Sequence, residues 1–269
     1  MASSDAAAGA AAPPPLLQLR GISKHFGPVQ ALAGVDLDVP AGQVTALCGD
    51  NGAGKSVLVK CIAGIHEPDG GEIIWEGAVV RVRNPRESAA LGIEVVYQDL
   101  ALADNLDVVA NMFLGRERTR IGVMLDESTM EHAARETLDS LSVTSLRSVR
   151  QIVAGLSGGQ RQAVAVAKAV MWNSKLVILD EPTAALGVAQ TRQVLDLVRR
   201  LAERGLGVVI VSHNLHDIFE CADRITVLRL GQRVAQFEMA KTNQEEVVHA
   251  ITAGKLTHVP GMADAAAEA

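Results

Sequence analysis

The chain has 269 residues, 48% of them apolar and 21% charged, so it can form one or two domains with packed cores, and wholesale disorder or a collagen-like fibre is excluded. Its 25 Lys and Arg and 31 Asp and Glu give a net charge of −6, and 3% of the residues are aromatic. This balance argues against electrostatic binding of nucleic acid, which needs a basic face. It leaves nucleotide binding open, because a nucleotide carries few charges and needs only a local site.

Neither a membrane span nor a disulfide framework is expected. The sequence has no run of about 18 uncharged apolar residues, so no helix should cross a bilayer. The N-terminal segment is apolar but has no basic region, and we interpret it as a flexible tail rather than a signal peptide. Cys48, Cys61 and Cys221 are too few and too scattered for a disulfide framework or a zinc site, which favours a reducing cytoplasm.

Residues 1–15 and 259–269 are expected to be flexible tails, and residues 16–258 to form a single domain. Its first elements should be antiparallel strands over Leu16–Leu19, Val35–Val39 and Ile73–Trp75. Residues about 100–150 carry helical patterns and no convincing strand, so we interpret the segment of about 100–157 as an inserted helical subdomain.

Elsewhere, short aliphatic runs alternate with helical patterns. The runs predicted to be strands are Val44–Cys48, Ile93–Tyr97, Leu176–Leu179 and Val208–Val211. The predicted helices cover residues of about 55–65, 159–172, 188–204 and 214–222. Strand alternating with helix indicates a mainly parallel sheet with crossover helices, and nearly pure aliphatic strands are typical of a sheet covered on both faces.

The segment from Gly49 to Ser56 fits the P-loop pattern G-x-x-x-x-G-K-[ST] at every fixed position. A predicted strand precedes it and a helix follows, which a chance Gly-rich turn would not require. Glycines let successive N–H groups point at phosphate oxygens, and the helix adds its positive end. Lys55 can place a cation between the terminal phosphates, and the Ser56 hydroxyl can hold Mg²⁺. The residues expected to bind the nucleotide here are Gly49, Asp50, Asn51, Gly52, Ala53, Gly54, Lys55, Ser56 and Val57.

Two adjacent acids, Asp180 and Glu181, end the predicted strand Leu176–Leu179. Acids at the end of a buried strand are costly unless they have a role, because unpaired charges are rarely buried. Asp180 suits the outer shell of Mg²⁺, and Glu181 suits a general base that orients the attacking water. The alternative is that both acids merely cap the strand or the following turn.

Leu156-Ser157-Gly158-Gly159-Gln160 precedes the helix predicted to start near Gln160. Alone, this turn is equally well explained as a helix N-cap or as a second anion site built from bare amides. The order of the motifs resembles that of the ATP-binding-cassette (ABC) ATPases, over about Leu16 to Gly254. The resemblance implies an α/β fold: a P-loop NTPase cassette with a mainly parallel core sheet, an N-terminal antiparallel β-subdomain and an inserted helical subdomain.

The resemblance also assigns roles to further residues. In that family two cassettes face each other head to tail, so a second copy's Ser157, Gly158, Gly159 and Gln160 would contact the γ-phosphate, which implies a functional dimer. Gln98 would touch Mg²⁺ or the attacking water, His213 would contact the γ-phosphate and position water, and Phe26 would stack on adenine. The plain alternatives are an exposed Gln, a structural His and a core Phe. ATP and Mg²⁺ are the implied cofactors.

A narrower resemblance concerns Tyr97–Leu102 and Asn105–Gly115, which look like segments of the ATPases of bacterial carbohydrate importers of the ribose, galactose and fructose group. It implies an ATPase at the cytoplasmic face of the inner membrane that works as a homodimer or paired cassette. Its partners would be membrane permease subunits and, indirectly, a periplasmic binding protein, with no nucleic acid.

Two features depart from the family pattern. Many members of the sugar group fuse two cassettes, whereas this sequence holds one, and Gly187 stands where many cassettes have an Asp. The missing carboxylate puts communication across the dimer in doubt but leaves Lys55, Asp180 and Glu181 intact. Two alternatives to a transport ATPase stay open: a cassette ATPase acting on nucleic acid or ribosomes, and a regulator that binds nucleotide without hydrolysis.

Overall fold

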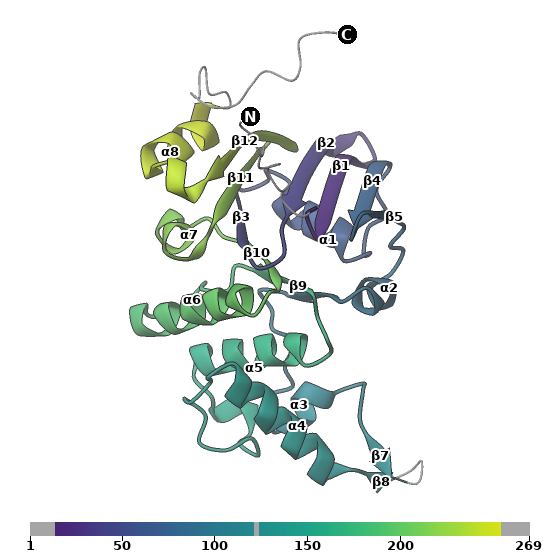
Figure 1. Cartoon of the computed structure of the whole chain (residues 1–269), viewed down its shortest axis with the longest axis vertical. Helices are drawn as coiled ribbons and strands as arrows, with labels where there is room; N and C mark the ends of the chain where they lie inside the picture. Colours follow the sequence, from purple (N-terminus) through teal and green to yellow (C-terminus); the bar gives the residue numbers. More distant parts are fainter. Residues whose placement is uncertain (1–13, 121–123, 254–269) are drawn as a thin grey trace, which may run out of the picture.

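The computed structural model describes residues 14–120 and 124–253, and its elements form two main sheets with helices around them (Figure 1). The first sheet is antiparallel with the order β2-β1-β4-β5. Its strands are β1 (Leu17–Phe26), β2 (Val29–Val39), β4 (Gly70–Trp75) and β5 (Ala78–Val80). The predicted antiparallel set is confirmed, although the strands extend well beyond the predicted runs and β5 was not predicted.

The second sheet has the order β12-β11-β3-β10-β9-β6. All its neighbouring strands are parallel except β12, which pairs antiparallel with β11 at the edge. The strands are β3 (Val44–Cys48), β6 (Ile93–Val96), β9 (Leu176–Asp180), β10 (Gly207–Val211), β11 (Arg224–Arg229) and β12 (Gln232–Glu238). The four predicted strands are confirmed, and the hairpin of β11 and β12 extends the sheet beyond them.

Helices cover this core sheet, and two apolar cores result. One core lies between the antiparallel sheet, α1 and one face of the core sheet, and the other lies between the opposite face and the later helices α5, α6, α7 and α8. The helices near the core sheet are α1 (Lys55–Ile62), α2 (Pro85–Ala90), α5 (Gly158–Val170), α6 (Val188–Glu203), α7 (Leu215–Cys221) and α8 (Gln244–Ala253). The predicted helices are confirmed, with ends that differ by a few residues.

The segment between β6 and α5 carries helices, as predicted, joined by long loops, and lies at the end of the molecule opposite α8 (Figure 1). It contains α3 (Val108–Phe113) and α4 (Glu127–Ser140). The expectation that this segment contains no strand is wrong, because β7 (Thr119–Arg120) and β8 (Met124–Leu125) form a short antiparallel ladder. All four of its residues are exposed, so no alternation between buried and exposed positions marks them in the sequence.

The described residues bear on two predictions, one about membrane-spanning helices and one about the cysteines. None of the helices in residues 14–120 and 124–253 combines the length and apolarity needed to cross a bilayer. Cys48, Cys61 and Cys221 are each buried with a free thiol. The predicted tails lie almost entirely outside the described residues, so the domain boundaries stay predictions.

Candidate nucleotide site

The loop between β3 and α1 forms a tight turn that depends on glycine. Gly49 has φ 144° and Gly54 has φ 101°, conformations that other residues rarely adopt. A Cβ on Gly49 would lie 2.0 Å from the Leu228 carbonyl oxygen, and one on Gly54 would lie 2.9 Å from the Ala31 carbonyl oxygen. The loop therefore curls closely against β2 and β11, and the helix N-terminus begins directly after it.

A pocket of about 480 Å³ opens over this loop and joins elements that are distant in the sequence. Most predicted residues of the nucleotide site line it: Asn51, Gly52, Ala53, Gly54, Lys55, Ser56, Val57, Gln98, Asp180 and Glu181. Sequence reasoning missed the other side of the pocket, which consists of Val29, Gln30, Ala31, Val211, Leu230 and Gly231. These residues belong to β2, β10 and the β11–β12 turn and carry no motif that would mark them.

Lys55 is buried in this pocket with 8% of its surface exposed. Its Nζ donates hydrogen bonds to the carbonyl oxygens of Gly49 at 2.7 Å and Asp50 at 3.0 Å. The ammonium is therefore held by the loop that it follows, at the place where phosphate oxygens would replace part of its hydrogen bonding. Gly49 and Asp50 do not line the pocket, but their carbonyl oxygens accept the hydrogen bonds that hold the Lys55 side chain.

The two acids lie at the carboxyl end of β9, beside the P-loop. Burial raises the pKa of Asp180 above its usual value, the neighbouring Glu181 raises it further, and the Lys55 ammonium offsets part of this. Glu181 has φ 51°, the left-handed conformation, and its N–H donates to the Val211 carbonyl oxygen at 2.9 Å. Both acids line the pocket over the P-loop, and their catalytic and metal-binding roles stay predictions.

His213 lies next to these acids rather than on the pocket wall. Its Nδ1 is 2.8 Å from Glu181 Oε2, with 68% of the His213 side chain and 17% of the Glu181 side chain exposed. An imidazole in this contact restrains the orientation of the carboxylate. The structure thus brings His213 into contact with Glu181, while the implied contact of His213 with a γ-phosphate stays a prediction.

Ser56, Gln98 and Asp180 supply a hydroxyl, an amide and a carboxylate to one side of the pocket. Such oxygen donors fit Mg²⁺, which keeps waters and shares its coordination with substrate phosphates. The described residues contain no cluster of three His, Cys, Asp or Glu side chains that could hold a metal ion by themselves. The donor set therefore fits an ion that arrives together with a phosphate ligand.

The turn Ser157–Gln160, here called the signature turn, does not line this pocket. Ser157 caps α5 by accepting a hydrogen bond from the Gln160 N–H at 3.3 Å, and Gln160 Oε1 accepts one from the Ser157 N–H at 2.9 Å. Ser157 and Gly158 are exposed. The helix-cap interpretation is confirmed, and the same cap leaves the start of α5 accessible to an anion from another molecule.

Segments after the acids pack beneath the signature turn. A Cβ on Gly158 would lie 2.8 Å from Leu186 Cδ2, and one on Gly159 would lie 3.2 Å from Gln190 Cβ. Gly187 begins α6 without a side-chain cap, and Gln190 Oε1 accepts a hydrogen bond from its N–H at 3.4 Å. Gln190 thus satisfies the N–H of residue 187, whereas the first-turn N–H groups of α6 that an Asp at position 187 would cap have no side-chain acceptor from that position.

Phe26 lies at the end of β1 and does not line the pocket. Its side chain is 43% exposed, so it is not a core residue. The ring meets His66 edge-on with 5.1 Å between ring centroids, and the Lys24 Nζ lies 5.7 Å from its centroid. The ring is therefore held in place from two sides while retaining exposed surface.

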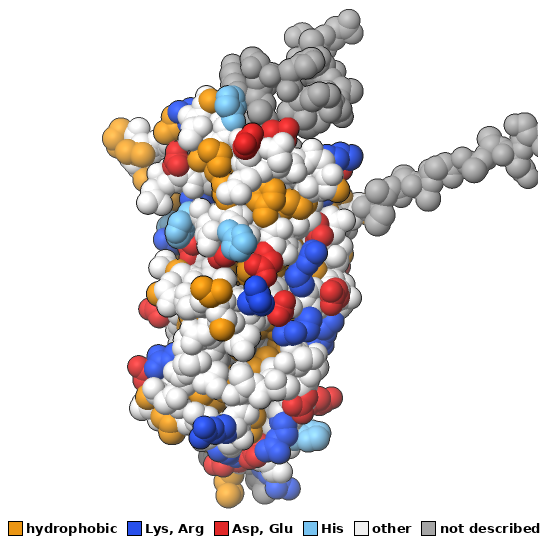
Figure 2. Space-filling view, turned by 90° about the vertical axis from the view of Figure 1, so that its left-hand side faces the viewer, with side chains coloured by type: hydrophobic (Ala, Val, Ile, Leu, Met, Phe, Trp, Pro, Cys, Tyr) orange, Lys and Arg blue, Asp and Glu red, His pale blue; other side chains and the backbone are white. Residues whose placement is uncertain are grey.

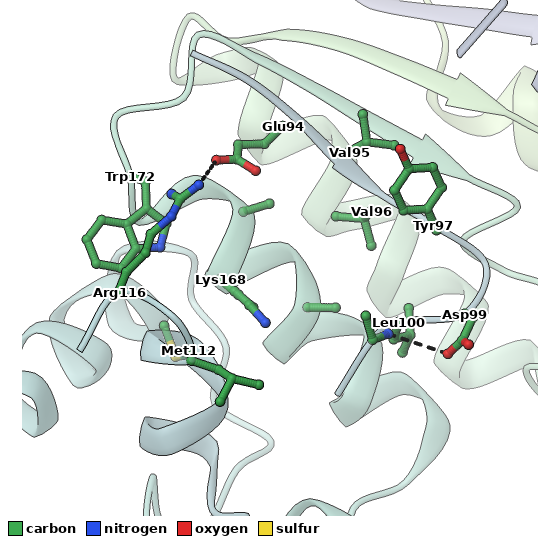
Figure 3. A pocket seen from close by; sticks show the side chains of 14 residues that line it. Glu94, Val95, Val96, Tyr97, Asp99, Leu100, Met112, Arg116, Lys168 and Trp172 are labelled. Carbon is green, nitrogen blue, oxygen red and sulfur yellow. Dashed lines mark hydrogen bonds and ion pairs between the residues drawn. The ribbon is translucent and has the colours of Figure 1, made fainter. Parts of the chain in front are cut away.

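A second pocket of about 300 Å³ lies between β6, α3 and α5 (Figure 3). At its rim Arg116 pairs with Glu94 at 3.2 Å, and the guanidinium lies 5.1 Å from the Trp172 ring centroid. Lys168 lines the same pocket (Figure 3). Burial lowers the pKa of Lys168 and the nearby Arg116 lowers it further, while Glu94 offsets part of this.

Comparisons with known proteins agree with this geometry. The family described as ABC transporter matches residues 32–184. The xylose/arabinose import ATP-binding protein XylG of Sulfolobus acidocaldarius is 45% identical, over 91% of this chain and 96% of its own. The fructose import ATP-binding protein FrcA of Rhizobium meliloti is also 45% identical, over 90% and 95%. The ribose import ATP-binding protein RbsA 1 of Rubrobacter xylanophilus is 44% identical over 87% of this chain. The matched region makes up 46% of the length of RbsA 1, so this chain spans about half of that relative.

Solved structures confirm the fold class. A nucleotide-free ATP-binding cassette from an ABC transporter superposes with a TM-score of 0.76 at 26% identity, covering 87% of this chain and 94% of that one. A dimeric cassette in a post-hydrolysis state, bound to ADP and Pi, superposes with a TM-score of 0.68 at 25% identity, covering 83% and 98%.

Proposed function

The chain belongs to the ABC transporter family and is an ATPase, and from this premise we propose that it is the energy-coupling subunit of a sugar importer. The proposal includes a nucleotide site shared by two copies, and the observation that carries it is the separation of the phosphate pocket from the signature turn within one chain. If both motifs grip the same triphosphate, two copies must face each other head to tail. The dimeric cassette bound to ADP and Pi supports a dimer.

In this proposal the P-loop amides and Lys55 bind the triphosphate, and the adenine stacks on the exposed part of Phe26. Ser56, Gln98 and Asp180 would hold Mg²⁺, which supplies positive charge to the phosphate oxygens when it is bound. The signature turn of the second copy closes over the γ-phosphate. The helix N-termini of α1 and of the second copy's α5 then approach the same anion from opposite sides.

Hydrolysis would follow from the contact between Glu181 and His213. The Glu181 carboxylate accepts a proton from a water molecule, and the water oxygen attacks the γ-phosphorus while the bond to the β-phosphate oxygen breaks. His213 holds the carboxylate through its Nδ1 and presents its other ring nitrogen toward the phosphate side. Loss of the γ-phosphate removes the anion that joins the two copies, so the dimer reopens.

The transported cargo is proposed to be a sugar because the relatives XylG, FrcA and RbsA 1 are named as xylose/arabinose, fructose and ribose import proteins. Membrane permease subunits, and indirectly a binding protein outside the membrane, would be its partners, which would place the chain at the cytoplasmic face of the inner membrane. No observation favours the nucleic-acid alternative: the net charge is −6, and the face in Figure 2 shows acidic side chains scattered among the basic ones.

The pocket of Figure 3 is the proposed docking place of the permease. Its walls are largely apolar, and the Lys168 ammonium has no ion-pair partner among the described residues. A docking segment with an apolar face and one carboxylate would complement both features. Lys168→Glu should therefore weaken co-purification with a co-expressed permease at least about 10-fold, the size of a broken buried charge contact. Lys241→Glu, at an exposed position outside this pocket, should leave it unchanged, and equal retention of permease by both variants would contradict the docking place.

The proposed catalytic role is tested with Glu181→Gln. The variant should bind ATP with little change, because the P-loop and Phe26 are intact, while turnover falls by about 10²–10⁴-fold, as expected for the loss of a general base. Steady-state phosphate release and direct nucleotide binding give the two values. Turnover within a few-fold of the wild type would remove Glu181 from this role.

A further inference from the structure

Asp217 is a buried carboxylate beside the catalytic acids, outside the nucleotide pocket. It lies on α7 with 2% of its surface exposed, and it does not line the pocket over the P-loop. Each of its oxygens accepts a hydrogen bond from a different loop. Thr183 Oγ1 donates to Oδ2 at 2.6 Å, and Asn214 Nδ2 donates to Oδ1 at 2.9 Å.

The two loops that meet on Asp217 are those that carry Glu181 and His213. Thr183 is two residues after Glu181, and Asn214 directly follows His213. The first loop is internally tight, since the Ala184 N–H donates to the Glu181 carbonyl oxygen at 3.1 Å. A shift of Thr183 would therefore move the backbone of Glu181.

Glu181 depends on such external support. Its left-handed φ of 51° is unfavourable for a residue with a side chain and persists only where surrounding contacts hold it. One contact is the hydrogen bond from its N–H to Val211, and the Thr183–Asp217 bond fixes the other side of the residue. A hydrogen bond from a hydroxyl to a buried carboxylate is short and strong, which suits this purpose.

We propose that Asp217 is a positioning residue for ATP hydrolysis, which holds the Glu181 loop and the His213 loop in register so that the 2.8 Å contact between Glu181 and His213 forms. The inference rests on the proposed catalytic roles of these two residues. Asp217 touches neither nucleotide nor water in this account. Its effect passes through Thr183 on one side and Asn214 on the other.

The test compares Asp217→Ala and Thr183→Val with the wild type in steady-state ATPase assays of the purified chain. Each variant removes the Thr183–Asp217 bond, so kcat should fall by about 10- to 100-fold, the range expected when a reacting group is misplaced by about 1 Å. KM for ATP should stay within about 2-fold, since the P-loop contacts are untouched. The double variant should be no worse than the more damaged single variant, because both changes break the same link.

Rescue by Asp217→Asn separates hydrogen bonding from mere packing. The amide oxygen can accept from Asn214 while the amide nitrogen donates to the Thr183 hydroxyl, so both links survive. This variant should keep kcat within about 3-fold of the wild type, as expected when the geometry is preserved. A matched control is Asp223→Asn, a carboxylate that instead accepts from the Val44 N–H at 2.8 Å and pairs with Arg199 at 3.1 Å. It should lower thermal stability without lowering kcat of the folded protein.

The outcomes are distinct. An unchanged kcat in Thr183→Val, a parallel change of kcat and KM, or an Asp217→Asn variant as inactive as Asp217→Ala would each overturn the positioning role. Should Asp217→Ala fail to fold, Thr183→Val decides alone, because it replaces a hydroxyl by a methyl of similar size. A wild-type chain without any ATPase activity would count against the proposed function instead.

Discussion

Gly49→Ala offers a quantitative test of how closely the P-loop is packed against the β11 strand. The added methyl would lie 2.0 Å from the Leu228 carbonyl oxygen and 3.2 Å from Ala53 Cβ. The oxygen belongs to the backbone of a paired strand, so relief requires the loop or β11 to move by about 1 Å or more, as in overpacked cores.

The expected cost has two parts. Strain of a non-glycine residue at φ 144° costs about 1–3 kcal/mol, and overpacking adds about 1–3 kcal/mol. The sum of about 2–6 kcal/mol is a large share of a typical free energy of unfolding of about 5–15 kcal/mol. The matched control is Gly52→Ala in the same loop, with φ 80° and no atom within 4 Å of the new Cβ. It should cost only about 1–2 kcal/mol of left-handed strain.

Urea unfolding of both variants, without nucleotide, gives the two free energies. Both variants should unfold with an unchanged slope, and the Gly49 variant should unfold at a clearly lower denaturant concentration than the Gly52 variant. If Gly52→Ala costs as much as Gly49→Ala, the close approach of Leu228 does not fix this loop, and the reasoning from the Cβ position fails.

Two further predictions concern the base and the acids. Phe26→Ala should raise KM for ATP by about 5- to 150-fold, the equivalent of about 1–3 kcal/mol of base stacking, with little effect on kcat; an unchanged KM would separate Phe26 from nucleotide binding. The raised pKa of Asp180 means that its ionised form costs stability in the folded chain, so Asp180→Asn should stabilise the nucleotide-free protein at neutral pH. The gain in stability of Asp180→Asn over the wild type should shrink as the pH falls through the raised pKa of Asp180 toward the ordinary aspartate value. An equal gain at neutral pH and near that ordinary value would show that the ionised Asp180 is not its cause.

Much of the site could be predicted because its motifs are continuous in sequence. The P-loop needs glycine where the backbone has positive φ, so the spacing of Gly49, Gly52 and Gly54 makes the loop recognisable in the sequence. The aliphatic run before Asp180 and Glu181 marks a buried strand, and strand ends at one edge of a parallel sheet place their side chains together. The positions of Gln98 and His213 follow from strand ends in the same way, although their roles came only from the resemblance.

The rest depends on contacts that no local pattern records. Leu230 and Gly231 reach the pocket through the β11–β12 turn, where the Gly231 N–H donates to the Ala53 carbonyl oxygen at 3.0 Å. Asp217 is one acid among many in the sequence, and only its burial and its two hydrogen bonds distinguish it. Similarly, Gln190 is an ordinary helix residue until the structure shows it beneath Gly159.

The shared nucleotide site is tested most directly by mixing two inactive variants. Lys55→Ala disables the phosphate pocket, and Ser157→Asp keeps the α5 cap but places a negative charge where the γ-phosphate would lie. Each variant alone should be inactive. In an equimolar mixture about half of the head-to-tail dimers pair one variant with the other and hold one intact site, so about a quarter of the wild-type ATPase rate should return. A mixture that stays inactive although the two variants associate with each other would contradict a site built from two copies.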